Sequence, residues 1–244
     1  LKGKALFFNQ HYVRFIEGMD AMQMEIPVEW SVPFLKNLVE ETAAANKLGN
    51  ARVRLTFWRK AGGYYTPENQ TPEFIIEAFP LTETYYNLNA NGLITEVYAE
   101  ITKSVNVLSP FKSANALPYV MAGLYKSKRN LDDVLLCNTE RRIIEATFSN
   151  IFLVTGKTIL TPAVEEGCIN GVMRRVLIKM CKQIQIDLVE TQITMEDIQK
   201  ADEVFLTNVM QGIRWVNKIN DINFRLGIAP VLLGKLNELI MDAA

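Results

Sequence analysis

The segment Ser109-Pro-Phe-Lys-Ser-Ala-Asn-Ala-Leu117 is followed along the chain by Glu145-Ala-Thr-Phe-Ser-Asn150 and then by Gly171-Val-Met-Arg174. The first segment carries Lys112 just before a predicted helix, whose N-terminal end has a partial positive charge. The second carries a carboxylate between two apolar stretches. The third begins an amphipathic helix, and the free amides of its first turn can bind an anion. An amine, a buried carboxylate and an anion-binding helix start together indicate a site for a phosphorylated aldehyde cofactor.

Each of these features also has a simpler interpretation. Most lysines before a helix are ordinary surface residues, and a buried Glu145 usually needs a cationic partner, here Arg141 or Arg142. The functional partner of Glu145 would be the protonated pyridine nitrogen of pyridoxal 5′-phosphate. At about 3 Å and an effective dielectric near 20 that attraction is roughly 5 kcal/mol before desolvation. Because one pKa unit corresponds to about 1.4 kcal/mol, even half of that attraction would keep the pyridine nitrogen protonated at neutral pH, as an electron sink requires.

Two places in the sequence offer backbone amides to a phosphate group. The first is the helix start, where the amides of Val172 and Met173 lack intrahelical acceptors. The second is the turn that follows a predicted strand, over 207–213. A doubly charged phosphate also favours a bidentate cation, which Arg14 or Arg54 can supply.

Composition excludes several classes of protein. The net charge of -1 gives no basic field for nucleic acid or an anionic membrane, and no apolar run reaches the roughly 18 residues of a membrane span. The lone histidine, His11, argues against a histidine-based metal site. The odd number of cysteines (Cys137, Cys168 and Cys181), without metal-binding spacing, predicts reduced thiols in a cytosolic protein.

The chain is long enough for two α+β domains. We expect a small first domain over 1–80, a linker over 81–91 and a larger second domain over 92–244. The start at Leu1 suggests that an N-terminal piece is absent, and 1–8 is predicted to be a strand. In the first domain the pattern predicts a helix over 32–48, capped by Ser31, and strands over 52–59 and 73–79.

The second domain is richer in β-branched and alternating apolar residues. The predicted strands cover 92–103, 132–138, 142–145, 151–155 and 204–207, and the predicted helices cover 114–128, 172–184, 195–200 and 230–241. Thr194 and Asp197 resemble a capping box. Gly156-Lys-Thr158 lacks the upstream glycine of a phosphate-binding loop and is interpreted as a hairpin turn.

These motifs, in this order, resemble those of class IV aminotransferases, the fold-type IV group of pyridoxal phosphate enzymes. The group includes branched-chain aminotransferases, D-amino acid aminotransferases and 4-amino-4-deoxychorismate lyases. His11-Tyr-Val-Arg14 is similar to the family's His-x-x-Arg, whose arginine binds the cofactor phosphate. Lys112-Ser-Ala-Asn-Ala-Leu117 matches the lyase and D-amino acid branches rather than the Gly-Asn-Tyr form of the branched-chain enzymes. The resemblance implies a two-domain fold with the cofactor at the domain interface.

The resemblance also implies roles for single residues. Lys112 would be the catalytic amine that bonds to the cofactor aldehyde, and Glu145 would neutralise the ring nitrogen. The other expected cofactor contacts are the Arg14 side chain, the backbone amides of Val172, Met173 and Val209, and the side chains of Asn115, Ile169 and Asn208. No metal is expected.

The reaction stays open between two activities. A lyase would eliminate pyruvate from aminodeoxychorismate to give 4-aminobenzoate, whereas an aminotransferase would exchange an amino group with a 2-keto acid. The segment from Thr207-Asn208 to Gly212-Ile213 is closer to the lyases, but Arg214-Trp215 replaces their common ending. The Arg-x-His pair of D-amino acid aminotransferases is not evident in 59–65. A non-catalytic relative is a third reading, and the resemblance implies a homodimer.

Overall fold

The computed structural model describes residues 1–243, which form two compact units. Unit 1 comprises 1–85 together with the residues from Glu238 onward, and unit 2 comprises Tyr86–Asn237. The boundary between Tyr85 and Tyr86 lies inside the segment 81–91 that we expected to be a linker. Each unit has a core of its own.

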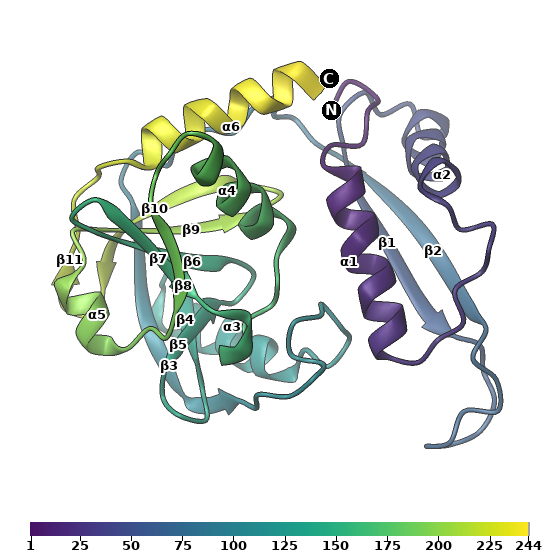
Figure 1. The fold of residues 1–244 in the computed structure, drawn as a ribbon, viewed down its shortest axis with the longest axis horizontal. Helices are drawn as coiled ribbons and strands as arrows, with labels where there is room; N and C mark the ends of the chain where they lie inside the picture. Colours follow the sequence, from purple (N-terminus) through teal and green to yellow (C-terminus); the bar gives the residue numbers. More distant parts are fainter. Residues whose placement is uncertain (244) are drawn as a thin grey trace. The chain divides into compact units, whose positions relative to one another are not determined.

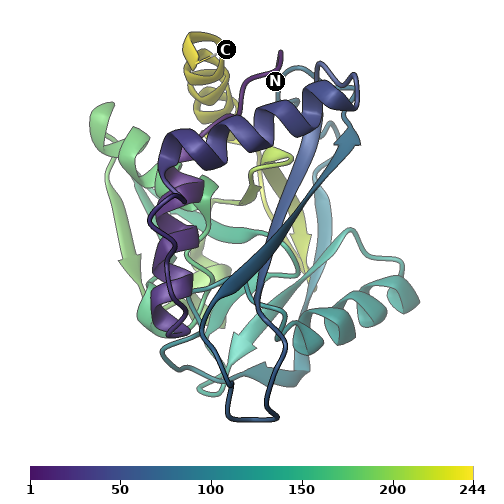
Figure 2. The ribbon, with the colours of Figure 1, turned by 90° about the vertical axis from the view of Figure 1, so that its right-hand side faces the viewer.

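Unit 1 combines two helices with a hairpin. Helices α1 (Phe8–Ala21) and α2 (Val32–Ala45) precede the antiparallel strands β1 (Ala51–Arg59) and β2 (Pro72–Pro80), which Figure 2 shows as a long twisted ribbon. The predicted cap is present, since the Ser31 side chain accepts a hydrogen bond from the Phe34 N–H. Met19, Trp30 and Leu35 form the core of this unit with aromatic side chains of the hairpin.

The expected strand over 1–8 was wrong. Lys2 and Gly3 have positive φ angles of 49° and 75°, which an extended strand cannot accommodate, and the Gly3 N–H donates to the Gly49 carbonyl. The chain turns here and enters α1 at Phe8. Phe8, Tyr12 and Phe15 all pack on the core of unit 1, at the spacing of one helical face.

Unit 2 is built on a nine-stranded sheet. Its strands are β3 (Leu93–Lys103), β4 (Asp133–Asn138), β5 (Ile143–Ala146), β6 (Asn150–Thr155), β7 (Thr158–Pro162), β8 (Leu188–Thr191), β9 (Glu203–Asn208), β10 (Gly212–Ile219) and β11 (Ile222–Asn223). The order is β5-β4-β3-β10-β9-β6-β7-β8, with β11 paired to β10. The sequence patterns had not predicted β7, β8, β10 or β11.

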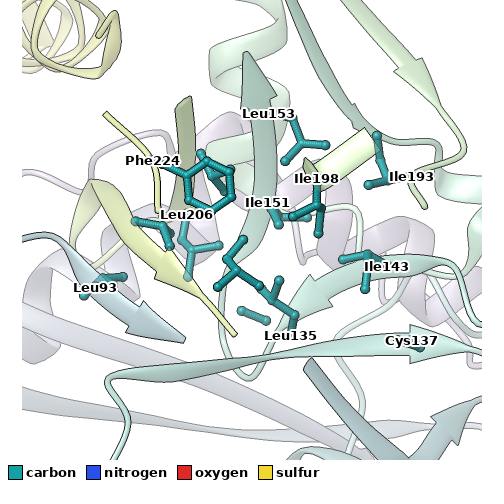
Figure 3. Packing of buried hydrophobic residues seen from close by; sticks show 14 residues of the cluster. Leu93, Leu135, Cys137, Ile143, Ile151, Leu153, Ile193, Ile198, Leu206 and Phe224 are labelled. Carbon is teal, nitrogen blue, oxygen red and sulfur yellow. The ribbon is translucent and has the colours of Figure 1, made fainter. Parts of the chain in front are cut away.

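β5 and β6 contact each other although they are not neighbours in the hydrogen-bonded order, which shows that the sheet curls. The Ala146 N–H at the end of β5 donates to the Ser149 carbonyl just before β6. Inside the curl lies the main core of unit 2, in which Leu135, Ile151 and Leu206 are buried side by side (Figure 3). The short turn over 147–149 joins the end of β5, which carries Glu145, to the start of β6.

Four α-helices and one short 3-10 helix accompany the sheet of unit 2 (Figure 1). They are α3 (Leu117–Arg129), η1 (Val164–Glu166), α4 (Val172–Gln183), α5 (Met195–Lys200) and α6 (Ala229–Ala243), whose last residues from Glu238 fall in unit 1. Helix α3 packs on β3 and β4, and α4 packs on β8 and β9. The capping box of Thr194 and Asp197 is confirmed.

The single histidine gives a direct test of packing in unit 1. Burial, and secondarily the nearby Arg14 guanidinium, lower the pKa of His11 to about 4. We expect the one imidazole signal in an NMR titration to report a pKa near 4 in the folded protein. The unfolded chain takes up this proton near pH 6.5, whereas the folded chain takes it up only near pH 4. The stability that the folded state gains from keeping His11 neutral is therefore complete above pH 6.5 and is lost as the pH falls toward 4.

The control for this titration is His11→Gln, which removes the titrating group. Its thermal midpoint should fall less than that of the wild type between pH 7 and pH 5. A folded-state pKa near 6.5 would show that water reaches His11 more freely than its half-buried position in the structure implies.

Candidate active site

The centre of the site is the carboxylate of Glu145 on β5. Every residue of this short strand is buried, and Glu145 is 2% exposed. Antiparallel pairing places Glu145 opposite Leu136 of β4, so the carboxyl group lies inside a buried part of the sheet. A buried carboxylate is stable only with hydrogen-bond donors and a positive charge beside it.

Lys103, the last residue of β3, provides that positive charge. Its Nζ atom lies 2.8 Å from Oε1 of Glu145, and the two side chains are 13% and 3% exposed. The same ammonium donates to the Tyr119 hydroxyl at 2.7 Å and to the Ser109 carbonyl at 3.3 Å. All three donors of the ammonium group therefore have acceptors.

The other two partners of Glu145 come from different parts of unit 2. The Tyr119 hydroxyl, on α3, donates to Oε1 at 2.6 Å. Burial, followed by the charge of Glu145, raises the pKa of the Tyr119 phenol far above its usual value, so the hydroxyl stays a donor. The Ile169 N–H donates to Oε2 at 2.8 Å. A carboxylate oxygen can accept more than one hydrogen bond, so Oε2 has capacity for a second donor.

Asn150, the first residue of β6, connects Ile169 to the start of α4. Its Nδ2 atom donates to the Ile169 carbonyl at 2.7 Å. Its Oδ1 atom lies where a side chain at Gly171 would be, 2.1 Å from the position of a Cβ. Only glycine fits there, and α4 begins one residue later with Val172 and Met173, both buried. The first-turn amides of α4 have no acceptor within the helix.

The end of β9 completes the cluster. Thr207 is opposite Asn150 in the antiparallel β6–β9 pair, and the Asn208 side chain donates to the Ser149 hydroxyl at 3.0 Å. The carbonyl of Val209 accepts a hydrogen bond from the Tyr86 hydroxyl at 2.7 Å. Within residues 1–243, the Thr207 hydroxyl is one of four buried side-chain atoms without a hydrogen-bond partner. A polar group on a ligand would satisfy it.

Lys112 belongs to the segment between β3 and α3. The carbonyl of Pro110 accepts a hydrogen bond from the Asn170 N–H at 2.9 Å, which attaches this segment to the residues before α4. The side chains of Lys112 and Asn115 are exposed. The structure thus joins the backbone of the Lys112 segment to the cluster around Glu145, Ile169 and Asn150.

The two arginines predicted to bind a phosphate are not in unit 2, to which the residues around Glu145 belong. Arg14 lies on α1 and Arg54 on β1, both in unit 1. The Arg54 guanidinium pairs with Glu77 of β2 at 2.6 Å. The simpler partners considered for Glu145 were wrong, because Arg142 pairs with Glu166 and Arg141 donates to the Ala99 carbonyl.

Sequence reasoning missed Lys103 and Tyr119. Lys103 is 42 residues before Glu145 and Tyr119 is 26 residues before it. The parallel β3–β4 pair and the antiparallel β4–β5 pair bring Lys103 to Glu145. No local pattern reveals that register.

Comparison with known proteins identifies the family. The family model for amino-transferase class IV matches residues 2–219, so the chain belongs to this family. It is 28% identical to the "Putative branched-chain-amino-acid aminotransferase" of Methanocaldococcus jannaschii, in a match that covers 86% of this chain and 73% of that protein. It is 22% identical to D-alanine aminotransferase of Listeria monocytogenes, covering 98% of this chain and 82% of that protein.

A solved structure gives a third relative. The "Putative 4-amino-4-deoxychorismate lyase" of Legionella pneumophila superposes with a TM-score of 0.87 and is 28% identical, covering 98% of this chain and 87% of that one. The predicted α+β fold of the class IV enzymes is therefore confirmed. The protein is an enzyme, and its cofactor is pyridoxal 5′-phosphate, on which this class depends.

The residues of unit 2 fit this cofactor. Oε2 of Glu145 can accept a hydrogen bond from a protonated ring nitrogen, and the amides that begin α4 and the buried Thr207 hydroxyl suit a phosphate. In the part of the chain that the structure describes, no cluster of acidic, histidine or cysteine side chains could hold a metal ion. No helix among the described residues has the length and apolarity to cross a membrane.

Close packing at the start of α4 gives a stability prediction. In Gly171→Ala the new methyl group would collide with Oδ1 of Asn150, whose amide is already held by Ile169. We expect the free energy of unfolding to fall by about 1–3 kcal/mol, which would lower the thermal midpoint. We also expect weaker binding of pyridoxal phosphate.

The matched control is Gly123→Ala within α3, where a Cβ has open space. Alanine there should leave the protein equally stable or stabilise it by about 0.5–1 kcal/mol. If Gly171→Ala behaved like this control, the contact with Asn150 would not constrain the helix start.

Proposed function

We propose that the protein is a 4-amino-4-deoxychorismate lyase, which eliminates pyruvate from its substrate and leaves 4-aminobenzoate. The observation that carries a pyridoxal phosphate site is the buried Glu145 carboxylate, whose Oε2 can receive a ring nitrogen. The lyase assignment is supported by Lys112-Ser-Ala-Asn-Ala-Leu117 and by the 28% identity to the Legionella protein.

In this proposal the residues of the cluster hold and orient the cofactor. Glu145 keeps the ring nitrogen protonated, while Ile169 packs against the ring. The amides of Val172, Met173 and Val209 bind the phosphate. The family resemblance adds three further contacts to this proposal. Arg14 would be the cation that binds the phosphate, and Asn115 and Asn208 would contact the cofactor.

Lys112 is the proposed catalytic residue. Bound pyridoxal phosphate withdraws electrons from the bonds at the α-carbon of an amino substrate. Lys112 would hold the cofactor through its Nζ atom until a substrate amine binds. With substrate bound, the Lys112 amine would act as base and acid, taking the α-proton and returning it.

An aminotransferase is the second candidate. The relatives from Methanocaldococcus jannaschii and Listeria monocytogenes, named for a branched-chain and a D-alanine activity, favour it. The altered Arg214-Trp215 ending also weakens the lyase assignment. Both reactions begin with removal of the same proton, so the cluster around Glu145 serves either one.

We also propose a homodimer located in the cytoplasm. Helix α3 exposes Leu117, Val120 and Leu124 at 68%, 55% and 51%, and Val107 before it is 81% exposed. Several exposed apolar side chains on one helix are typical of an interface between copies of a chain.

Replacing the proposed amine tests the mechanism. In Lys112→Ala we expect turnover to vanish and borohydride to trap no covalent adduct between protein and cofactor, as judged by absorbance and peptide mass. The control is Lys128→Ala, an exposed lysine on α3, which should keep both. Survival of the adduct in Lys112→Ala would mean that another amine carries the cofactor.

Product analysis separates the two reactions. Incubation of the purified protein with aminodeoxychorismate should release pyruvate and 4-aminobenzoate in equal amounts. In parallel, branched-chain L-amino acids and D-alanine are each offered with 2-oxoglutarate, and keto-acid formation is measured. Brisk keto-acid exchange without any 4-aminobenzoate would exclude the lyase and establish the aminotransferase.

A further inference from the structure

Three groups of unit 2 form a closed hydrogen-bonded triangle. Lys103 Nζ donates both to Oε1 of Glu145 and to the Tyr119 hydroxyl, and that hydroxyl donates to the same Oε1. The three distances are 2.8, 2.7 and 2.6 Å. The third donor of the ammonium reaches the Ser109 carbonyl, so the triangle is anchored to the backbone as well.

The triangle involves only Oε1 of the Glu145 carboxylate, so Oε2 remains available to other donors. Oε1 accepts two strong donors, one of them charged, whereas Oε2 accepts the Ile169 N–H. Because both oxygens are held from fixed elements, the carboxylate plane cannot rotate freely. Any further donor therefore approaches Oε2 from one direction.

We propose that Lys103 and Tyr119 are positioning residues that hold Glu145 charged and turned so that Oε2 receives the cofactor ring nitrogen. This inference rests on the proposed role of Glu145. Neither residue needs to touch the cofactor, since both act through Oε1. A protonated carboxyl could not accept hydrogen bonds at Oε1 from both partners as well as an ionised carboxylate does.

Lys103 does not serve as the amine that carries the cofactor. Its ammonium donates to three acceptors, one of them the carboxylate that the ring nitrogen requires. The aldehyde carbon lies across the ring from the nitrogen, so an amine bonded there cannot also sit on the nitrogen's own carboxylate. The two lysines thus have separate tasks, Lys112 at the aldehyde and Lys103 behind the carboxylate.

The test compares two ligands that differ in one ring atom. Apoenzyme of the full chain is titrated with pyridoxal phosphate and with its carbocyclic analogue, in which carbon replaces the ring nitrogen. The ratio of the two dissociation constants isolates the contact between Glu145 and the nitrogen, because both ligands share the aldehyde and the phosphate. Wild type should strongly prefer pyridoxal phosphate, and Glu145→Gln should lose this preference.

The positioning variants are Lys103→Met and Tyr119→Phe. We expect each to reduce the preference for the nitrogen-containing ligand about tenfold, the effect of weakening a hydrogen bond to a charged group. Combined with Glu145→Gln, neither should lower it further, because they act through that carboxylate. Tyr119→Phe removes only a hydroxyl, so it tests the proposal even if Lys103→Met folds poorly.

Controls come from the same helix. Tyr125→Phe removes another tyrosine-to-glutamate hydrogen bond, to Glu96 at 2.8 Å, and Lys128→Met removes an exposed charge. Both should keep the wild-type ratio. Borohydride should still trap the cofactor on Lys112 in Lys103→Met.

The outcomes separate the two proposals. If wild type shows no preference between the ligands, Glu145 does not meet the ring nitrogen, and the proposed site falls with the inference. If only Glu145→Gln changes the ratio, while Lys103→Met and Tyr119→Phe match the controls, the positioning role alone is overturned. A trapped adduct that survives Lys112→Ala and disappears in Lys103→Met would overturn it as well.

Discussion

The negative charge of Glu145, placed inside a sheet with little access to water, is the constraint on which the rest of unit 2 depends. Removing one partner of such a buried pair typically costs about 3–5 kcal/mol, because the remaining charge is left without compensation. The partners of Glu145 come from the end of β3, from α3 and from the segment before α4. These three parts of the chain are held together by the need to satisfy one carboxylate.

The same residues order the neighbouring helix start. Ile169 uses its N–H on Glu145 and its carbonyl on Asn150, so the segment that leads into α4 is fixed at both peptide groups. Asn150 in turn occupies the space that a side chain at Gly171 would need. The position of the first-turn amides is thereby tied to that of the carboxylate. A ligand that has a cationic ring and a phosphate meets two prearranged partners at a fixed separation.

Much of unit 2 was predictable because its signals are local. The capping box at Thr194, the helix that starts after Gly171 and the buried strands each follow from a few adjacent residues. The strand expected over 1–8 failed because apolar residues there mark the approach to a helix, and positive φ angles at Lys2 and Gly3 turn the chain. Glu145 was recognisable as a buried carboxylate, whereas Lys103 was not recognisable as its partner. The pairing depends on strand register between segments far apart in sequence, which no single window contains.

In the proposed site Lys103 and Lys112 have different tasks, and their surroundings differ accordingly. An amine attacks an aldehyde with its lone pair, and an ammonium that donates three hydrogen bonds has no lone pair to offer. Lys103 is in that state, in contact with a carboxylate and a phenol inside the protein. Lys112 lies in an exposed segment whose backbone is joined to the cluster at Pro110. Burial next to an acid therefore suits Lys103 for holding charge in place, which leaves the covalent role to Lys112 in the proposed site.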